Sequence, residues 1–528
     1  MKAHFELKNI LQSIDAKGYK SYKTLEDEYK FGEFTLYIDH VQGDPFASPS
    51  GMRVRVAQNT AGFPADTYTN RSREIALRDF ITRKFHEAIN KLSKSRRGSG
   101  KSGLISIDAP GQEILERTSA FVNESYVEVR FTVGLPAFGR KVAGKEAEAI
   151  FFDELPQIIS DSLLFKSLDI DTLYKHIKTS EDADFLRNEL ENLRLIAFVA
   201  EGSILPRESG VSALPLQGDK VIPFLSPENL KMDVELPNKG QITGMGIPRG
   251  ITFIVGSDSH GKSTLLNAIG QGIYNHIPGD GREYVVSNPN SVKIGSEKGR
   301  NITRVNISAF TNEIKYSSSF STDNSSSEIS QTANIVEAVE VGADVLLIDR
   351  EVTKLFIQKA KSLFYEYMVS SILVKEDLAK YYDVADFVIE VNNYQAEDIT
   401  VEAKEVAEKI KREIETDTYI GSIGERIPLA ESIDLGRDNP GVIDLNSIEQ
   451  LVTASQTKAI GDAINYAKKY MDGEKSFRQV TSLVMLDIGR SGLDVLNPRL
   501  TSDYAEFRKL ELAAAINRLR SLKVEKKG

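Results

Sequence analysis

The sequence predicts an α/β protein with more than one domain, and three observations support this fold class. The chain has 528 residues, more than one hydrophobic core usually serves. Short apolar runs with the period of strands alternate with stretches that have the period of helices. One run, Ile251–Val255, leads directly into a glycine-rich loop and then into a helix-forming segment. We expect domains over residues 1–160, 161–440 and 441–528.

Composition is that of an ordinary globular protein. Apolar residues make up 41% of the chain and charged residues 27%, and the net charge is -10. No apolar run approaches the length of a membrane span, and Met1–Tyr22 lacks the apolar core of a signal peptide. The chain has no cysteine, which excludes disulfides and thiolate metal sites. We therefore expect a cytoplasmic protein with no membrane partner.

The N-terminal part is expected to be an α/β accessory domain. Phe34–Ile38 and Tyr126–Val133 alternate as strands do, and residues 72–92 have apolar positions at helical spacing. Residues 151–200 also show helical spacing. The final segment, 441–528, is again helical by pattern, which predicts a small helical C-terminal domain.

A basic stretch lies in the N-terminal part, from Lys91 to Lys101. The net negative charge of the chain argues against wholesale binding of nucleic acid, but a local basic patch remains compatible with it. The stretch is either a solvated surface loop or a loop that contacts the phosphates of RNA or DNA.

The glycine-rich loop has the full G-x-x-x-x-G-K-[ST] pattern, G-S-D-S-H-G-K-S. Backbone N–H groups in such a loop point at phosphate oxygens, and the following helix N-terminus favours an anion. Lys262 is expected to reach the β- and γ-phosphates of ATP, and the Ser263 hydroxyl to ligate Mg²⁺. The predicted nucleotide-binding residues here are Gly256, Ser257, Asp258, Ser259, His260, Gly261, Lys262, Ser263 and Thr264.

A second, shorter loop has a similar sequence, G-S-G-K-S at residues 98–102. It lacks the first glycine of the pattern, because position 95 is serine. The residues before it are charged, so no buried strand enters it. We predict that this loop does not bind nucleotide.

A buried strand that ends in an acid lies downstream, Val345–Asp349. Asp349 is the predicted magnesium carboxylate and a catalytic candidate. A serine-rich segment, 325–331, caps a helix just before this strand. That order is typical of ABC-type ATPases, in which the cap addresses the γ-phosphate bound by a partner subunit. Ser330 and Gln331 are therefore further candidate nucleotide contacts.

Several long stretches resemble the predicted ATPases of the ABC class, a family of stand-alone soluble proteins. The resemblance covers nearly the whole chain. It implies an N-terminal domain, an ABC-type nucleotide-binding domain and a small helical C-terminal domain, with ATP and Mg²⁺ as ligands and RNA as a candidate partner. The matching stretches are F-G-E-F-T-L-Y-I-D-H-V-Q-G-D-P-F-A from Phe31, S-G-K-S-G-L-I-S-I-D from Ser99, F-V-A-E-G-S-I-L-P-R from Phe198, G-M-G-I-P-R-G-I-T-F-I-V-G from Gly244, Y-N-H-I-P-G-D-G-R-E from Tyr274 and Q-L-V-T-A-S-Q-T-K-A-I-G-D-A from Gln450.

The chain departs from the family pattern at several site positions. Asp258 adds a negative charge to the phosphate loop, and Glu328 adds one to the helix cap. Arg350 stands where the family has its catalytic glutamate, so Glu351 serves only if the strand end shifts register. The family's switch sequence is replaced from Val374 by V-K-E-D-L-A-K-Y. These changes fall on hydrolysis and γ-phosphate sensing more than on binding.

Two hypotheses of equal standing follow. The chain is either an ATPase that works as a homodimer, with Asp349 and Glu351 as catalytic candidates, or a nucleotide-gated scaffold for nucleic acid with little turnover. A kinase that passes phosphate to a small molecule is a weaker third hypothesis, because no acceptor motif is evident.

Overall fold

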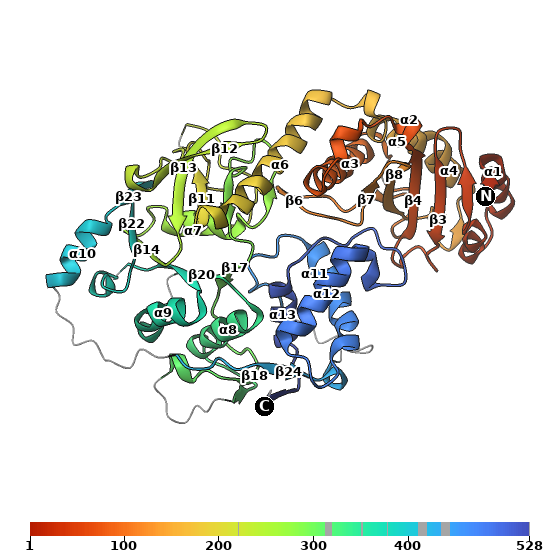
Figure 1. Ribbon diagram of the computed structural model, residues 1–528. Coiled ribbons are helices and arrows are strands. Elements are labelled where there is room, and N and C mark those ends of the chain that lie inside the picture. The colour runs from red at the N-terminus through yellow and green to blue at the C-terminus, as the bar shows by residue number, and fades with distance from the viewer. Residues whose placement is uncertain are drawn as a thin grey trace. The chain divides into compact units, whose positions relative to one another are not determined.

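The computed structural model describes residues 1–94, 96–219, 221–311, 319–349, 352–376, 378–409, 420–433 and 444–526 (Figure 1). The chain forms two compact units. Unit 1 comprises Met1–Glu181 and Leu493–Glu506, and unit 2 comprises Asp182–Gly492 and Phe507–Gly528. The predicted division into three domains stays a prediction.

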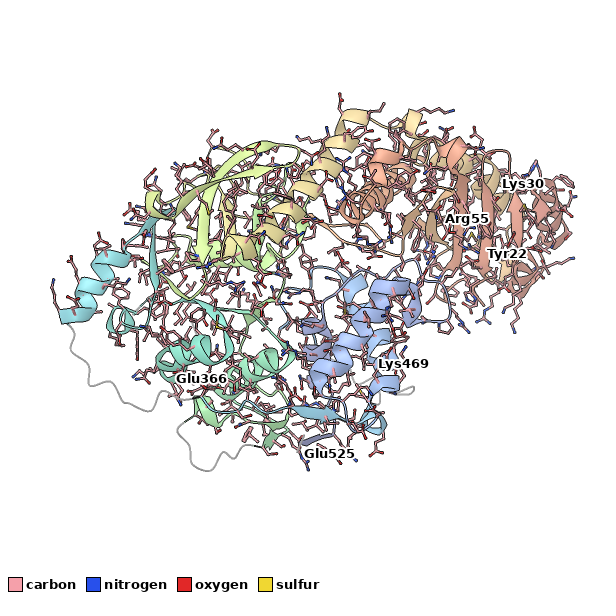
Figure 2. The ribbon with its side chains drawn as sticks, viewed as in Figure 1. Tyr22, Lys30, Arg55, Glu366, Lys469 and Glu525 are labelled. Atoms are coloured by element: carbon pink, nitrogen blue, oxygen red, sulfur yellow. The ribbon has the colours of Figure 1, made fainter. Side chains whose placement is uncertain are left out.

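Unit 1 is built on a seven-stranded sheet with the order β1-β2-β3-β4-β8-β5, in which β7 also pairs with β8. Strand β4 alternates: Met52, Val54 and Val56 are buried, and the residues between them are partly exposed. The predicted strand Tyr126–Val133 is present as β8, but Val127–Phe131 are all buried, so its burial does not alternate. Tyr22, labelled in Figure 2, is fully buried, and its hydroxyl donates to the Pro136 carbonyl at 2.7 Å. The strands are β1 (Lys2–Ala3), β2 (Glu28–Lys30), β3 (Thr35–His40), β4 (Ser50–Ala57), β5 (Ile105–Ser106), β7 (Ala120–Val122) and β8 (Tyr126–Val133).

Helices pack on the apolar face of this sheet and share one core with it. One of the two long helices, α3, has its N-cap at Asn70, whose side chain accepts from the Arg73 amide. Three short strands also lie in this part of the chain, β6 (Glu113–Ile114), β9 (Ala137–Phe138) and β10 (Lys141–Val142). The helices are α1 (His4–Ile14), α2 (Gln58–Ala61), α3 (Arg71–Leu92), α4 (Gly144–Ala149), α5 (Leu155–Ser162) and α6 (Ile170–Asn192), which runs on into unit 2.

Unit 2 contains a four-stranded antiparallel sheet and a six-stranded, mainly parallel sheet (Figure 1). The antiparallel sheet has the order β12-β13-β11-β16, with β11 (Leu195–Ala200), β12 (Lys231–Leu236), β13 (Gly240–Pro248) and β16 (Val285–Ser287). The parallel sheet has the order β17-β20-β21-β14-β22-β23, and only the β22–β23 pair is antiparallel. Its strands are β14 (Ile251–Val255), β17 (Ser291–Ile294), β20 (Val345–Asp349), β21 (Ser370–Val374), β22 (Phe387–Asn392) and β23 (Gln395–Asp398).

The central strands β14 and β21 of the parallel sheet are buried along their whole length and mostly apolar, because helices cover both faces. Alternate side chains of each strand enter different cores: Phe253 packs with α8 (Ser327–Val341) and α9 (Lys354–Tyr367), and Ile254 packs with α7 (Lys262–Gln271). This confirms the predicted α/β fold class for this part of the chain. The remaining elements of this region are α10 (Thr400–Lys409) and the short strands β15 (Asn275–His276), β18 (Ile302–Val305) and β19 (Phe320–Thr322).

The C-terminal segment is helical as predicted, with α11 (Ala454–Ala467), α12 (Phe477–Ser491) and α13 (Lys509–Asn517). Lys469, labelled in Figure 2, donates to Asp487 of α12 at 2.8 Å. Strand β25 (Val524–Lys526) pairs with β24 (Arg426–Pro428). Within the described ranges, no helix is both long enough and apolar enough to cross a membrane.

Candidate nucleotide-binding site

The predicted phosphate loop connects β14 to α7 at the carboxyl edge of the parallel sheet. Three of its residues have positive φ, Gly256 (124°), Ser259 (64°) and Gly261 (105°), and this winds the backbone tightly. A Cβ on Gly256 would lie 2.2 Å from the Val391 carbonyl oxygen, so only glycine permits this approach to β22. The predicted strand, loop and helix therefore occur in the predicted order.

Lys262 is the first residue of α7 and is 5% exposed. Its ammonium group donates to the Gly256 carbonyl at 2.5 Å and to the Ser257 carbonyl at 2.7 Å, so it lies within the curve of the loop. The side chains of Ser257, Asp258 and Ser259 are exposed instead. The one buried cation of the loop thus sits where a phosphate oxygen can replace the two carbonyls as its acceptor.

The tip of the β22–β23 hairpin fixes the far side of the loop. Asn393 and Tyr394 both have positive φ, as the two-residue turn of a tight hairpin requires. The Tyr394 amide donates to the His260 carbonyl at 3.0 Å. The Tyr394 side chain remains 52% exposed and lies next to Gly261. Sequence reasoning did not identify this hairpin as part of the site.

Asp349 ends β20 at the same edge of the sheet as the phosphate loop. Strand β21 lies between β20 and β14, and its last residue, Val374, is in register with both Asp349 and Ile254. Two strand spacings, about 10 Å, therefore separate the Asp349 backbone from that of Ile254, two residues before the loop. Arg350, which replaces the family's catalytic glutamate, and the catalytic candidate Glu351 lie outside the described residues.

Lys375 follows β21 directly and so lies between the phosphate loop and the Asp349 strand. Its ammonium group donates to the Val352 carbonyl at 2.8 Å, which ties it to the segment that follows β20. In the sequence, this lysine lies where the switch segment of the ABC-class family begins. Only the strand register places it beside the phosphate loop and the strand that ends at Asp349.

The helix cap at α8 differs in detail from the prediction. Ser326 is the N-cap, and its side chain accepts from the Ile329 amide. Ser330 is completely buried, and its hydroxyl accepts from the Glu297 amide at 2.7 Å, while Gln331 is 2% exposed. The exposed side chains of this turn are those of Ser326, Ser327 and Glu328. A nucleotide contact through Ser330 or Gln331 stays a prediction, since both side chains point into the protein.

An apolar cavity of about 490 Å³ adjoins the phosphate loop. Gly261 and Thr264 line one side of it, at the end of the loop and the first turn of α7. Its other walls come from Leu205 and Phe224, on the segment after β11, and from Tyr394. The walls are thus brought together from segments far apart in the sequence, and no local pattern in the sequence marks them as one pocket.

The shorter glycine loop of unit 1 has a different structure. A Cβ on Gly98 would lie 2.2 Å from the Ala137 carbonyl oxygen, and the Ser102 hydroxyl accepts from the Ala137 amide at 3.1 Å. The backbone of this loop therefore packs against unit 1, and its serine hydroxyl forms a hydrogen bond within the same unit. Arg97 of the predicted basic stretch is 9% exposed and forms an ion pair with Glu154, whereas Lys101 is exposed.

The donor chemistry of the site fits a magnesium nucleotide. Ser263 and Asp349 offer the hard oxygen ligands that Mg²⁺ prefers, and Mg²⁺ normally takes few protein ligands together with phosphate oxygens. Among the described residues, no group of three or more histidine, cysteine, aspartate or glutamate side chains could hold a metal on its own.

Family models match three consecutive parts of the chain. Residues 4–166 match the N-terminal domain of ATPases of the ABC class, residues 169–355 and 349–426 match the P-loop domain of ABC ATPases, and residues 429–525 match the MRB1590 C-terminal domain. Uncharacterized protein MJ1628 of Methanocaldococcus jannaschii is 34% identical over 128 residues, which are 23% of this chain. The chain spans only 29% of the length of that relative.

Two solved structures resemble part of the chain. CbiO1 from Clostridium perfringens, part of the ABC transporter complex cbiONQ, is 17% identical, covers 41% of this chain and 92% of its own, and has a TM-score of 0.27. A bacterial Atm1-family ABC exporter with ATP bound is 10% identical, covers 42% of this chain and 43% of its own, and has a TM-score of 0.25. The assignment rests on the family models, which together run from residue 4 to residue 525 and show that the chain belongs to the ABC class of P-loop ATPases, with an N-terminal and a C-terminal accessory domain.

Proposed function

We propose that the chain binds ATP with Mg²⁺ in the loop from Gly256 to Ser263. The observation that carries this proposal is the arrangement at one sheet edge: a wound loop with positive φ at both glycines, a buried Lys262 inside its curve, and Asp349 two strands away. Phosphate oxygens would accept from the loop amides and from Lys262, and the N-terminus of α7 favours their charge.

Ser263 and Asp349 would hold the magnesium ion. When bound, the ion neutralises part of the triphosphate charge. Ser263 lies on the first turn of α7, directly after Lys262, and Asp349 ends a strand whose register is fixed by β21. The residues of this chain therefore contribute one hydroxyl and one carboxylate from two rigid elements.

The base would lie in the apolar cavity. Because Gly261 of the loop and Thr264 of the first turn of α7 line the cavity, a nucleotide with its phosphates in the loop would have its base beside the cavity. Phe224 and Tyr394 offer aromatic surface for a purine ring, and such contacts contribute about 1 kcal/mol beyond the area that they bury.

Hydrolysis is proposed to be slow. Turnover needs a base beside the attacking water, and the sequence places Arg350 directly after Asp349. The exposed Glu328 in the first turn of α8 adds negative charge at the helix end where a γ-phosphate from a partner subunit would approach. Asp349 and Glu351 remain the catalytic candidates.

A homodimer would complete the site. The first turn of α8 presents Ser326, Ser327 and Glu328 to solvent, so a second copy of the chain can reach it. Sedimentation velocity with ATP and with ADP tests this part. A monomer under both conditions contradicts it.

Binding and turnover are tested separately. Titration calorimetry with MgATP should give one nucleotide per chain for the wild type and binding about 100-fold weaker for Lys262→Ala, which loses the buried cation. Phosphate release in the same buffer should exceed that of Lys262→Ala by a small margin. Wild-type protein that binds no ATP refutes the proposal, and fast release refutes slow hydrolysis alone.

A nucleic-acid scaffold is the second candidate function, favoured by one observation in unit 1. Phe46 and Phe138 are each 64% exposed, and Gly100 and Ser99 of the short glycine loop lie against their segments. Exposed aromatic rings next to exposed cations bind unpaired bases and phosphates together. The exposed cations of the basic stretch are Lys91, Lys94, Arg96 and Lys101.

This second function has its own test. Fluorescence anisotropy with a labelled single-stranded RNA should show binding that falls steeply as salt rises. The double variant Phe46→Ala, Phe138→Ala should weaken it by about 30-fold or more, since stacking contributes roughly 1–3 kcal/mol per base and two rings are removed. Equal binding by the variant and the wild type argues against this surface.

A further inference from the structure

Two sequence stretches without an assigned role, 198–207 and 274–283, meet in unit 2. The Ile204 amide donates to the Gly281 carbonyl at 2.8 Å, and Arg282 Nε donates to the Leu205 carbonyl at 3.0 Å. Gly281 has φ of 83°, and a Cβ there would lie 2.6 Å from Ile204 Cβ. The turn after α7 is thus hydrogen-bonded to, and closely packed against, the segment that forms one wall of the cavity.

Asp280 is at the centre of this contact and its side chain is fully buried. Arg207 Nη2 donates to Asp280 Oδ2 at 2.7 Å, and Arg207 Nη1 donates to the Asp280 carbonyl at 2.9 Å. His276 Nδ1 lies 3.0 Å from the same carboxylate oxygen. Burial opposes ionisation of Asp280, but His276 and Arg207 outweigh it and hold its pKa below the usual range.

The contact joins the phosphate helix to the cavity wall. His276 Nε2 lies 3.4 Å from the carbonyl of Gln271, the last residue of α7. On the other side, Arg207 directly follows Leu205 and Pro206, which line the cavity. A continuous set of polar contacts therefore runs from the end of the helix that begins at Lys262, through His276 and Asp280, to the wall of the cavity.

We infer that the buried Asp280–Arg207 pair positions the cavity wall, so that it sets the affinity for the nucleoside part of a bound nucleotide and leaves the affinity for the phosphates unchanged. This inference rests on the proposed nucleotide binding. The pair touches neither the phosphate loop nor the cavity itself, so both residues act through Leu205 and Pro206 as positioning residues.

The test compares two ligands that share the phosphates. Dissociation constants are measured for MgATP and for magnesium tripolyphosphate with the wild type, Asp280→Asn and Arg207→Lys. Both variants should weaken ATP about tenfold or more, because a wall that is no longer held in place must be ordered on binding. Tripolyphosphate should change less than about twofold.

A matched control is the buried Arg97–Glu154 ion pair of unit 1. Glu154→Gln also leaves an arginine without its buried partner and should lower the melting temperature, yet it should leave the ratio of the two dissociation constants unchanged. If Asp280→Asn does not fold, Arg207→Lys decides, since it keeps the charge and loses only the forked geometry.

The outcomes separate the two claims. If the wild type binds neither ligand, the proposed nucleotide binding fails. If the wild type binds both and the variants lose both equally, or lose neither, the inferred positioning role is overturned while nucleotide binding stands.

Discussion

Two loops of this chain carry the same Gly-Lys-Ser triplet and have opposite surroundings. In the loop at 256–263, Lys262 is buried and its ammonium group lies on the carbonyls of the loop. In the loop at 98–102, Lys101 points to solvent and the loop packs on Ala137 and Pro45.

The difference shows that the triplet alone does not specify an anion site. A buried parallel strand enters the first loop and a helix of ten residues leaves it, so amides and helix N-terminus converge on one point. The second loop follows a charged stretch in which Arg97 forms an ion pair with Glu154. A turn, not a helix, follows this loop.

The largest expected effect separates the two lysines. Lys262→Ala should weaken MgATP binding about 100-fold, because charge-assisted hydrogen bonds to phosphate contribute roughly 1.5–3 kcal/mol each. Lys101→Ala should leave it unchanged. Equilibrium dialysis with radiolabelled ATP measures both, and equal losses in the two variants would break the comparison.

The next effect concerns the glycines, which are needed in both loops for the same steric reason. Gly256→Ala and Gly98→Ala each place a Cβ 2.2 Å from a carbonyl oxygen at positive φ. Each should destabilise its own unit by roughly 1–3 kcal/mol in urea unfolding. Only Gly256→Ala should also lower ATP affinity, and a loss of ATP affinity in Gly98→Ala would contradict the separation of the two loops.

A smaller effect is expected at Lys375, which lies between the phosphate loop and Asp349. Lys375→Ala should lower the preference for ATP over ADP about tenfold, as the loss of one charge-assisted contact to a terminal phosphate predicts. Lys361→Ala is the control, because Lys361 also donates to a backbone carbonyl, that of Asp383, but lies on α9. Competition binding gives the ratio, and an unchanged ratio in Lys375→Ala removes Lys375 from the site.

The smallest expected effect is on the pH dependence of unit 1 stability, through Asp79, and it should leave nucleotide binding unchanged. Burial opposes ionisation of Asp79, but Arg83 and His176 outweigh it and lower its pKa. Its stabilising effect is therefore present above the unfolded pKa of about 3.9 and is lost as pH falls through the folded value. Asp79→Asn should flatten the acid limb of unit 1 unfolding, by at most about 1.4 kcal/mol per pH unit.

The measurement is urea unfolding of unit 1 between pH 5 and pH 3, with ATP affinity measured at neutral pH as the control. An acid limb as steep in the variant as in the wild type would show that Asp79 does not contribute. A change in ATP affinity at neutral pH would show that the two units are coupled.

Much of the site could be predicted from local sequence. Ile251–Val255 is mostly apolar because both faces of its strand are covered, and the loop glycines are needed for positive φ. Asp349 was predictable for the same reason, as the polar end of a buried strand. The helical C-terminal segment and the existence of strands β3 and β8 of unit 1 also follow from periodicity, although the burial of β8 does not alternate.

The rest depends on contacts between distant segments. The cavity joins Leu205, Phe224 and Tyr394, which no periodic pattern connects. The burial of Ser330 follows from its hydrogen bond with the Glu297 amide, which is more than thirty residues away. Arg97 looked like part of a basic surface until the fold brought Glu154 beside it. In each case the contact is made between residues distant in the sequence, so it depends on tertiary packing and not on a local pattern.

Photo-crosslinking with an azido-adenine triphosphate tests the central claim most directly, because the label reports where the base lies. After digestion, mass spectrometry should find the label on peptides of the cavity wall, near Phe224 or Tyr394, and excess ATP or Lys262→Ala should abolish it. Label on the peptide that contains Lys101, or label that Lys262→Ala does not remove, would contradict the account.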